Sequence, residues 1–513
     1  MNSNSKRIAK NTMMLYVRMG ILLFVNLFAS RVLLEKLGVE DFGIYNVIGG
    51  VAGMFTFFTS SLANATQRFL NIELGRNNVE GAKNVFQQHL TLYLAILIGV
   101  IVVAEPIGLW LIHHKLVIPA DKLVAAVWIF QFTLVSLGAS LVGIVFNSVL
   151  VSHENMSVYA YLSIFEGIAK LLICYIISVA VSNRLIFYGL LLMLTNLLVQ
   201  ASYMSYCFKK YQECKIGVRW DKKLLRETSG IVGWNTVGTA VWMVNDNFMN
   251  ILLNMFFGPV VNAARAISFQ VNAALGNFTS NFFVAVRPQL MKGYSQKDFS
   301  NVKTLLYNST RYSIFLFFVL AIPVVFCIDP LLNLWLKQVP ENTALFSILV
   351  IAITFVSVPK NPLWDIVLAT GNLRKYQIVG CTILLFAFPI SYVLLRMGFP
   401  AVSVFYVLLV VRSFHYVVSV IIVLPMIECS LVEYSSCIYK PVLRVMPLAI
   451  ILHLLLKDIF PVGTLWTFGY IALSVMLNLC LIYTLGISSK EKQYVWSFVK
   501  LKLNHEKNHS KNG

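Results

Sequence analysis

One arginine stands in a stretch of sequence that otherwise has the composition of a membrane helix. Residues 257–275 read FGPVVNAARAISFQVNAAL, and Arg265 is the charged residue among them. Its guanidinium presents N–H donors in a planar fork that matches carboxylate and phosphate groups. An arginine near the centre of a membrane span costs about 2.5–3.5 kcal/mol, so it usually faces the bundle interior or a wet cavity. Arg265 therefore indicates either an anion-binding site or an internal ion pair.

Polar and small side chains share the helix face of Arg265. With a rotation of about 100° per residue, one face collects Asn262, Arg265, Phe269, Asn272 and Gly276. The preceding predicted helix carries a second set, which comprises Asn235, Gly238, Thr239, Trp242, Asn245 and Asp246. A third set lies on the second predicted helix and comprises Asn46, Gly49, Gly53, Ser60 and Asn64. We predict that the asparagines of these three sets line a cavity.

Close helix packing is an alternative for the glycine and asparagine positions. Small residues let two backbones approach, and amide side chains hydrogen-bond across helices. For Arg265, the alternative is a structural ion pair with Asp246 on the adjoining helix.

Other basic residues also fall inside predicted spans. Arg18 lies in MLYVRMGILL and has no acid on its own helix. Lys170 follows Glu166 by four positions, which places both on one helix face. Lys360 lies in VPKNPLWD, where two prolines interrupt the helix. We predict that Arg18, Lys170, Arg265 and Lys360 bind an anionic substrate, and that Asp246 and Glu166 take part in ion or proton coupling.

The whole chain has the composition of a membrane protein. Of its 513 residues, 58% are hydrophobic and 12% are charged, and the mean hydropathy is +0.75. Soluble proteins carry about 25% charged residues. Largely apolar runs, such as 185–204, 313–336 and 402–424, are long enough to cross a hydrocarbon layer of about 30 Å. We therefore predict an all-α polytopic membrane protein.

Fourteen transmembrane helices are predicted, with short loops between them. They span 12–34, 42–65, 89–112, 123–150, 157–182, 185–207, 229–257, 260–286, 312–336, 343–370, 376–396, 400–424, 441–457 and 463–486. Most of the 41 Lys and Arg residues lie on one side of the membrane, and KKYQECKIGVRWDKKLLRE alone carries seven. The positive-inside rule then places both termini in the cytoplasm. This asymmetry accounts for the net charge of +19 without a nucleic-acid partner.

The sequence repeats itself at an offset of 220 residues. FTSSLANATQRFL (58–70) matches FTSNFFVAVRPQL (278–290), and the same offset pairs Gly38 with Gly258. We predict two six-helix bundles, at 1–210 and 229–425, related by a pseudo-two-fold axis along the membrane normal, with the site between them. The remaining predicted parts are a basic linker at 211–228, an extra transmembrane helix pair at 426–486 and a basic cytoplasmic tail at 487–513.

No cofactor or metal site is expected from the sequence. The eight cysteines are scattered without a CxxC pair, and the neighbours His113 and His114 have no third ligand nearby.

Three segments carry a resemblance to a known family: LLEKLGVEDFGIYNVIGG (33–50), QRFLNIELGRNN (67–78) and LATGNLRKYQ (368–377). Together with the fourteen spans and the two-half plan, they make almost the whole chain similar to the oligosaccharide (O-antigen, Wzx-like) flippases. These flippases form the polysaccharide-transporter branch of the MATE/MOP exporter superfamily. The motifs are loose, and no site residue is carried over from them.

The resemblance implies a flippase rather than an enzyme. Its cargo would be an undecaprenyl-diphosphate-linked oligosaccharide, an O-antigen, capsule or exopolysaccharide unit, moved from the cytoplasmic to the outer leaflet of the bacterial inner membrane by alternating access. Membrane lipid and polysaccharide-assembly proteins are the further partners implied. The final helix pair is similar to the pair that forms a lipid-tail groove in fourteen-helix peptidoglycan-precursor flippases, and its apolar composition equally suits plain lipid-facing helices.

Other classes of protein share some of these features. A MATE-type antiporter of organic cations has the same plan but calls for a predominantly acidic cavity. A polysaccharide polymerase or ligase generally needs a sizeable outer loop, and every predicted outer loop here is short. A structural scaffold would not need charge buried on so many helices.

Overall fold

The computed structural model describes residues 3–56, 59–153, 155–177, 183–370, 373–457, 463–489 and 491–493, and these residues form helices joined by turns and loops. The α-helices are α1 (Ser3–Gly53), α2 (Thr59–Gly75), α3 (Val79–His114), α4 (Leu123–Ser152), α5 (Met156–Ile176), α6 (Arg184–Lys210), α7 (Lys222–Phe257), α8 (Pro259–Ser295), α9 (Phe299–Phe326), α10 (Ile328–Trp335), α11 (Thr343–Ser357), α12 (Lys360–Thr370), α13 (Arg374–Leu385), α14 (Ala387–Arg396), α15 (Val402–Val423), α16 (Leu431–Lys457) and α17 (Thr464–Leu481). Short 3₁₀ or π turns are η1 (Met54–Thr56), η2 (Ala120–Lys122), η4 (Leu424–Ile427) and η5 (Ile482–Gly486). The predicted all-α fold is confirmed.

Most predicted spans coincide with helices that are long and apolar enough to cross a membrane. Within the described residues there are nine such helices, or ten when α11 and α12, bent by 41° at their break, count as one broken span. The other four predicted spans lie on α1, η1 and α2, and on α7 and α8. The helices also run past the apolar stretches, because hydropathy marks only the part of a helix that lies in hydrocarbon.

Backbone turns repeat at the same offset of 220 residues as the sequence. Gly38, where α1 breaks, has φ 84°, and Gly258, between α7 and α8, has φ 76°. Asn77 and Lys297, which the same offset pairs, also have a left-handed backbone conformation, with φ of 54° and 57°. The next residue in each copy then caps a helix, since the Asn78 side chain accepts from the Gly81 N–H and the Asp298 side chain from the Asn301 N–H. These matched turns support the internal repeat, while the predicted domain boundaries stay a prediction.

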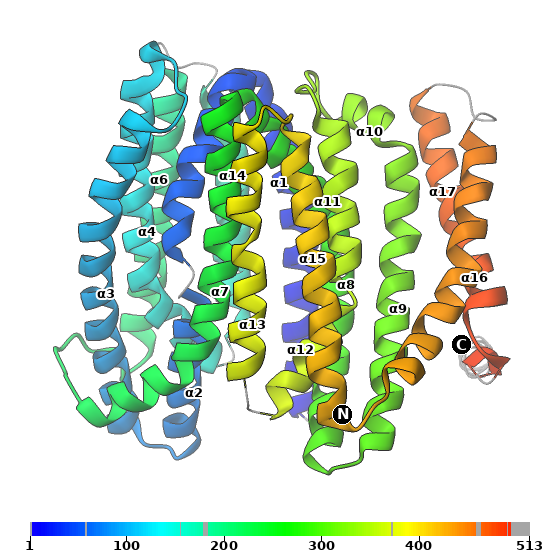
Figure 1. Ribbon diagram of the computed structural model, residues 1–513. Helices are drawn as coiled ribbons and strands as arrows, with labels where there is room; N and C mark the ends of the chain where they lie inside the picture. Colours follow the sequence, from blue (N-terminus) through cyan, green and yellow to red (C-terminus); the bar gives the residue numbers. More distant parts are fainter. Residues whose placement is uncertain are drawn as a thin grey trace, which may run out of the picture. The chain divides into compact units, whose positions relative to one another are not determined.

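The described chain divides into two compact units. The first comprises Met1–Gln270, Trp335–Phe346 and Leu373–Val411. In it, α4 packs against α2, α3 and α6, and α1 runs along α5 (Figure 1). Buried aromatic side chains fill its core, among them Phe86, Phe130 and Phe146.

The second unit comprises Val271–Leu334, Ser347–Asn372 and Arg412–Gly513. Its most buried span is α9, which packs against α12, α16 and α17 (Figure 1). Phe283, Phe317 and Ile351 belong to its hydrophobic core.

Candidate functional site

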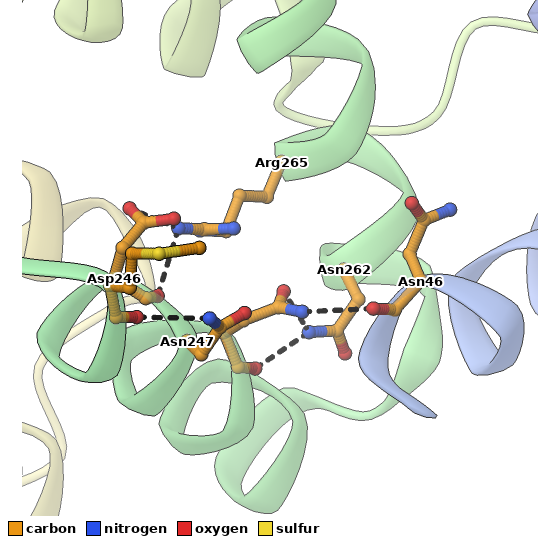
Figure 2. A network of polar contacts seen from close by, with 7 residues as sticks. Asn46, Asp246, Asn247, Asn262 and Arg265 are labelled. Atoms are coloured by element: carbon orange, nitrogen blue, oxygen red, sulfur yellow. Dashed lines mark hydrogen bonds and ion pairs between the residues drawn. The ribbon is translucent and has the colours of Figure 1, made fainter. Parts of the chain in front are cut away.

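Arg265 on α8 and Asp246 on α7 form an ion pair in the first unit. The Nη2 group of Arg265 donates to Asp246 Oδ1 at 2.8 Å and to the Asp246 backbone carbonyl at 3.1 Å (Figure 2). Gly258 connects the two helices in a left-handed conformation that favours glycine, and the resulting turn brings the side chains together. The ion pair that was the alternative interpretation of Arg265 is therefore present.

The guanidinium of Arg265 keeps donors for a further partner. Its Cζ lies 4.2 Å from the centroid of the Phe269 ring, and the arginine side chain is 8% exposed. Both of its hydrogen bonds leave from Nη2, and no described residue accepts one from Nε or Nη1. The Asp246 side chain is 28% exposed. An anion that reaches the pair can bind the remaining donors or take the place of the carboxylate.

An asparagine network beside the ion pair joins α8 to α7 and α1. Asn262 Nδ2 donates to the backbone carbonyl and to Oδ1 of Asn250, at 2.7 and 2.8 Å, and Asn262 Oδ1 accepts from Asn254 Nδ2 at 3.0 Å. Asn250 Nδ2 donates to the Asn46 backbone carbonyl at 3.2 Å (Figure 2). Asn262, a predicted cavity-lining residue, thus makes amide contacts between helices, as the packing alternative describes. Asn46 contributes only its backbone carbonyl, since its side-chain amide donates to the Phe42 carbonyl of its own helix.

Glycines on α1 allow these helices to approach so closely. A Cβ atom at Gly50 would lie 2.9 Å from Asn250 Nδ2, and one at Gly43 would lie 1.9 Å from the Pro259 carbonyl oxygen. At Gly49, by contrast, nothing lies within 4 Å. The glycine-rich sequence of this half of α1 is therefore required for its contact with the start of α8 and with the asparagines of α7.

A second group of predicted residues gathers on α1 and α5 of the same unit. Arg18 Nη2 donates to the Tyr159 hydroxyl at 3.3 Å, and Arg18 Cζ lies 4.5 Å from the centroid of that ring. Glu166 and Lys170 line a cavity of about 220 Å³, and both Lys170 and Arg18 interact electrostatically with Glu166. Two cations therefore surround one acid in this cluster.

The cavity next to Glu166 borders a second cavity of about 400 Å³. Thr133 and Ser136 line both, and Gly49 lines the larger one. Tyr45, which the offset of 220 makes the counterpart of Arg265, lines the smaller one. The polar interior of the first unit is thus built from hydroxyl groups on α4 and charged groups on α5.

The remaining predicted residues do not join these clusters. Lys360 and Asn272 belong to the second unit, where Lys360 interacts electrostatically with His415. Asn64 is exposed on α2. Asn245 is 1% exposed, and neither atom of its amide has a hydrogen-bond partner among the described residues. The side chain of Asn235 lies outside the described residues.

A second arginine–aspartate pair was not among the predicted site residues. In the second unit, Arg287 Nε on α8 donates to Asp365 Oδ1 on α12 at 2.6 Å. The Arg287 side chain is 47% exposed, whereas Asp365 is buried. Because hydropathy ends the eighth predicted span, 260–286, just before Arg287, the sequence does not predict this arginine as a residue of a span. Asp365 inside a predicted span was the signal, since a buried carboxylate needs a cationic partner.

The described residues contain no group of three or more His, Cys, Asp or Glu side chains that could hold a metal ion. The groups they do offer around Arg265 are a guanidinium, a carboxylate and amides. Such groups bind and exchange charged partners.

Comparison with known proteins gives a fold but no close relative. No family model matches the sequence, and no curated protein matches it either. Among solved structures, an inward-facing multidrug-resistance MATE-family transporter of the MOP superfamily is 12% identical, with a TM-score of 0.66 over 80% of this chain and 98% of that chain. The lipid II flippase MurJ in an inward closed conformation is also 12% identical, with a TM-score of 0.65 over 92% of this chain and 98% of that chain.

A third similar structure is a MOP-superfamily transporter from Pyrococcus furiosus, whose binding pocket is described as having reverse polarity. It is 12% identical, with a TM-score of 0.59 over 82% of this chain and 96% of that chain. The chain therefore has the fold of the MATE/MOP transporters and of the MurJ flippase, a polytopic membrane transporter fold. The predicted fold class is confirmed, and the predicted O-antigen branch stays a prediction.

Proposed function

We propose that this protein is a flippase that moves an undecaprenyl-diphosphate-linked oligosaccharide from the cytoplasmic to the outer leaflet of the bacterial inner membrane by alternating access. The observation that supports the proposal is the set of contacts made by the Arg265 guanidinium. Its guanidinium is held inside a membrane helix, keeps two nitrogen donors without a described partner and faces a single, partly exposed carboxylate. Such a group binds a diphosphate well and can return to its carboxylate afterwards.

A diphosphate with attached sugars cannot cross hydrocarbon alone, because its polar groups would lose water without any replacement. In the proposed mechanism, Arg265 supplies replacement hydrogen bonds while the prenyl chain stays in lipid. Arg18 and Lys170, which belong to the same unit as Arg265, are the further cations proposed to contact the diphosphate and sugars. Lys360 stays a predicted anion-binding residue of the second unit.

Asp246 is the proposed means of release. In the empty protein its carboxylate neutralises Arg265, and an incoming diphosphate displaces it. When the cargo leaves, the carboxylate forms the ion pair again and so prevents immediate rebinding. Protonation of Asp246 or Glu166 would shift this competition, which is how a proton gradient would couple to transport.

The comparisons support a flippase over a cation antiporter in one respect. MurJ matches 92% of this chain, whereas the MATE-family transporter matches 80% and the Pyrococcus furiosus MOP-superfamily transporter matches 82%. The acids also favour an anionic cargo. Asp246 and Asp365 already bind arginines, and Glu166 has two basic neighbours, so these three acids are neutralised and less able to attract an organic cation. Glu105 is the exception, because its carboxylate accepts a hydrogen bond from the neutral Gln131 amide instead.

The test is transport of a fluorescent prenyl-diphosphate oligosaccharide in proteoliposomes. Wild type is expected to move the lipid, Arg265→Ala to lose most of the activity, and Arg265→Lys to retain part of it. Glu491→Gln is the matched control, because it breaks an arginine ion pair in the second unit, that of Arg311. Transport of organic cations in place of the lipid would replace the flippase proposal with the MATE-type antiporter.

A further inference from the structure

The segment between α6 and α7 is an ordered extended loop that lies along α3. Gln87 Nε2 on α3 donates to the Lys215 carbonyl at 3.1 Å. The Arg219 N–H donates to Thr91 Oγ1 at 3.2 Å, and the Asp221 N–H donates to Gln88 Oε1 at 2.6 Å. These bonds fix residues 215–221, which we call the strap, on one face of α3.

The inner side of the strap is shaped for this contact. A Cβ atom at Gly217 would lie 2.5 Å from Gln87 Nε2, so a larger residue there would displace the Gln87 amide from its hydrogen bond to the strap. The Arg219 side chain also reaches α3, since its Nη1 donates to Asn84 Oδ1 at 2.6 Å. Just before the strap, Glu213 is buried and hydrogen-bonded to His153. The strap is therefore held at both ends.

The outer side of the strap carries three large apolar side chains at alternate positions. Ile216 is 74% exposed, Val218 is 92% exposed and Trp220 is 58% exposed. Exposed apolar groups that lie together on an ordered segment mark an interaction surface. Because the backbone of the strap is hydrogen-bonded, a fixed conformation holds these side chains outward.

Cations surround the exposed apolar side chains. Five exposed basic residues lie in or beside the strap: Lys209, Lys210, Lys215, Arg219 and Lys222. The acids of the same segment are Glu213, which is buried, and Asp221. The surface therefore combines apolar side chains with a positive charge.

The level of the strap along α3 indicates what this surface meets. Gln87 and Thr91 bracket the start of the predicted span 89–112, so the strap lies where the hydrocarbon begins. Farther along α3, Ile98 and Val102 are 65% and 66% exposed, as lipid-facing residues of a membrane helix are. Tryptophan is enriched at this boundary, and lysine and arginine extend from it toward headgroups.

We propose that the strap binds anionic phospholipids of the leaflet at the basic end of the bundle, the end predicted to be cytoplasmic. The apolar side chains of Ile216, Val218 and Trp220 insert at the boundary between headgroups and acyl chains. The surrounding lysines and Arg219 bind the headgroup phosphates. This proposal does not depend on the identity of the transported cargo.

The first experiment measures where Trp220 lies. The full chain is reconstituted in phosphatidylglycerol or in phosphatidylcholine bilayers that contain bromine-labelled acyl chains, which quench tryptophan at short range. The difference between wild type and Trp220→Phe isolates the emission of Trp220 from that of the other eight of the nine tryptophans in the chain. We expect quenching by the brominated lipid, and stronger quenching in phosphatidylglycerol. Equal quenching in the two lipids, or quenching by aqueous iodide alone, overturns the proposal, and the second result would suit a cytosolic protein partner.

The second experiment measures lipid affinity by native mass spectrometry of the full chain. The variant Lys215→Gln/Lys222→Gln is expected to bind phosphatidylglycerol about 30-fold more weakly, as the loss of two cations near an anionic surface predicts. The control Arg76→Gln/Lys83→Gln removes two cations of the same unit that already have acidic partners, and it should bind as wild type does. Unchanged phosphatidylglycerol affinity in the strap variant, or an equal loss in the control, overturns the proposal.

Discussion

Replacement of Asp246 by asparagine separates the two interpretations of Arg265. If the carboxylate competes with an anionic cargo, Asp246→Asn leaves the guanidinium in place, weakens its internal partner and strengthens cargo binding. If the ion pair only holds α7 against α8, the same substitution lowers the stability of the protein. Its affinity for cargo then falls as well. The two interpretations thus predict changes of opposite sign.

The size of the effect follows from the charge that is lost. Arg265 donates to Asp246 Oδ1 at 2.8 Å, and asparagine keeps an oxygen there without its charge. The bond keeps its charged donor, so Asp246→Asn removes only the attraction between two opposite charges, about 1 kcal/mol for a partly exposed pair. This corresponds to roughly fivefold in the dissociation constant. Arg265→Ala removes the charged bond to the cargo itself, so it should weaken binding about tenfold to hundredfold.

The assay is calorimetric titration of a prenyl diphosphate into the protein in nanodiscs, together with the melting temperature of each variant. We expect Asp246→Asn to bind more tightly and to transport more slowly in proteoliposomes, because release no longer has its competitor. The double variant Asp246→Asn/Arg265→Ala should bind the prenyl diphosphate with the same affinity as Arg265→Ala. Without the guanidinium, the carboxylate has no site for which it competes with the cargo. Glu491→Gln should leave the affinity unchanged.

One result would refute this reasoning. If Asp246→Asn and Arg265→Ala weaken binding by the same factor and lower the melting temperature equally, the two residues act as a structural unit. The anion site would then have to be sought at Arg18 and Lys170, around the cavity that Glu166 lines.

Three further predictions concern stability. Gly43→Ala should lower the melting temperature, because overpacking against Pro259 costs about 1–3 kcal/mol, whereas Gly49→Ala, which meets no atom within 4 Å, should not. Asn262→Ala should also lower the melting temperature, because it leaves buried amide groups without partners at a cost of about 1–3 kcal/mol. Burial alone would raise the pKa of Glu213, but hydrogen bonds from its histidine partner and from its own backbone lower that pKa below its usual value. The resulting stabilisation is complete above the unfolded-state pKa of about 4.3 and is lost as pH falls through the lower folded-state value. The rate of amide hydrogen exchange of residues 211–221, corrected for its intrinsic pH dependence, should therefore rise in wild type as pH falls. The same rate should not rise in Glu213→Gln.

The helices of this protein could be predicted from the sequence because the bilayer imposes a simple rule. Apolar runs of about 20 residues must be helical, since hydrocarbon offers no partner for the backbone. The rule does not tell where a helix ends outside the hydrocarbon, and α9 accordingly begins at Phe299, well before the predicted span 312–336. Hydrogen bonds to water and to capping residues such as Asp298 decide those ends, and hydropathy does not register them.

Pairing between helices was harder to predict than the helices themselves. Asp246 and Arg265 are 19 residues apart on adjoining helices, so their contact was one of two stated alternatives. Arg287 and Asp365 are 78 residues apart, and no local pattern links them. The choice between cavity and packing for the asparagines depended on which helix lies opposite, which is a property of the tertiary fold. Gly38 and Gly258 are an exception, because the offset of 220 residues already paired these two positions, and the backbone turns at both.

The two kinds of polar group around Arg265 suit two different tasks. The amides of Asn250, Asn254 and Asn262 are neutral, and the hydrogen bonds they make to one another do not change with the charge of a bound ligand. They can therefore hold α7, α8 and α1 in place whether cargo is bound or not. The ion pair beside them has the opposite property. Its electrostatic partner can be exchanged for another anion of similar strength, because the carboxylate is partly exposed and the guanidinium has donors to spare. Hydrogen-bonded asparagines next to an arginine whose partner can be exchanged are what the proposed flippase would need to bind an anion on one side of a membrane and release it on the other.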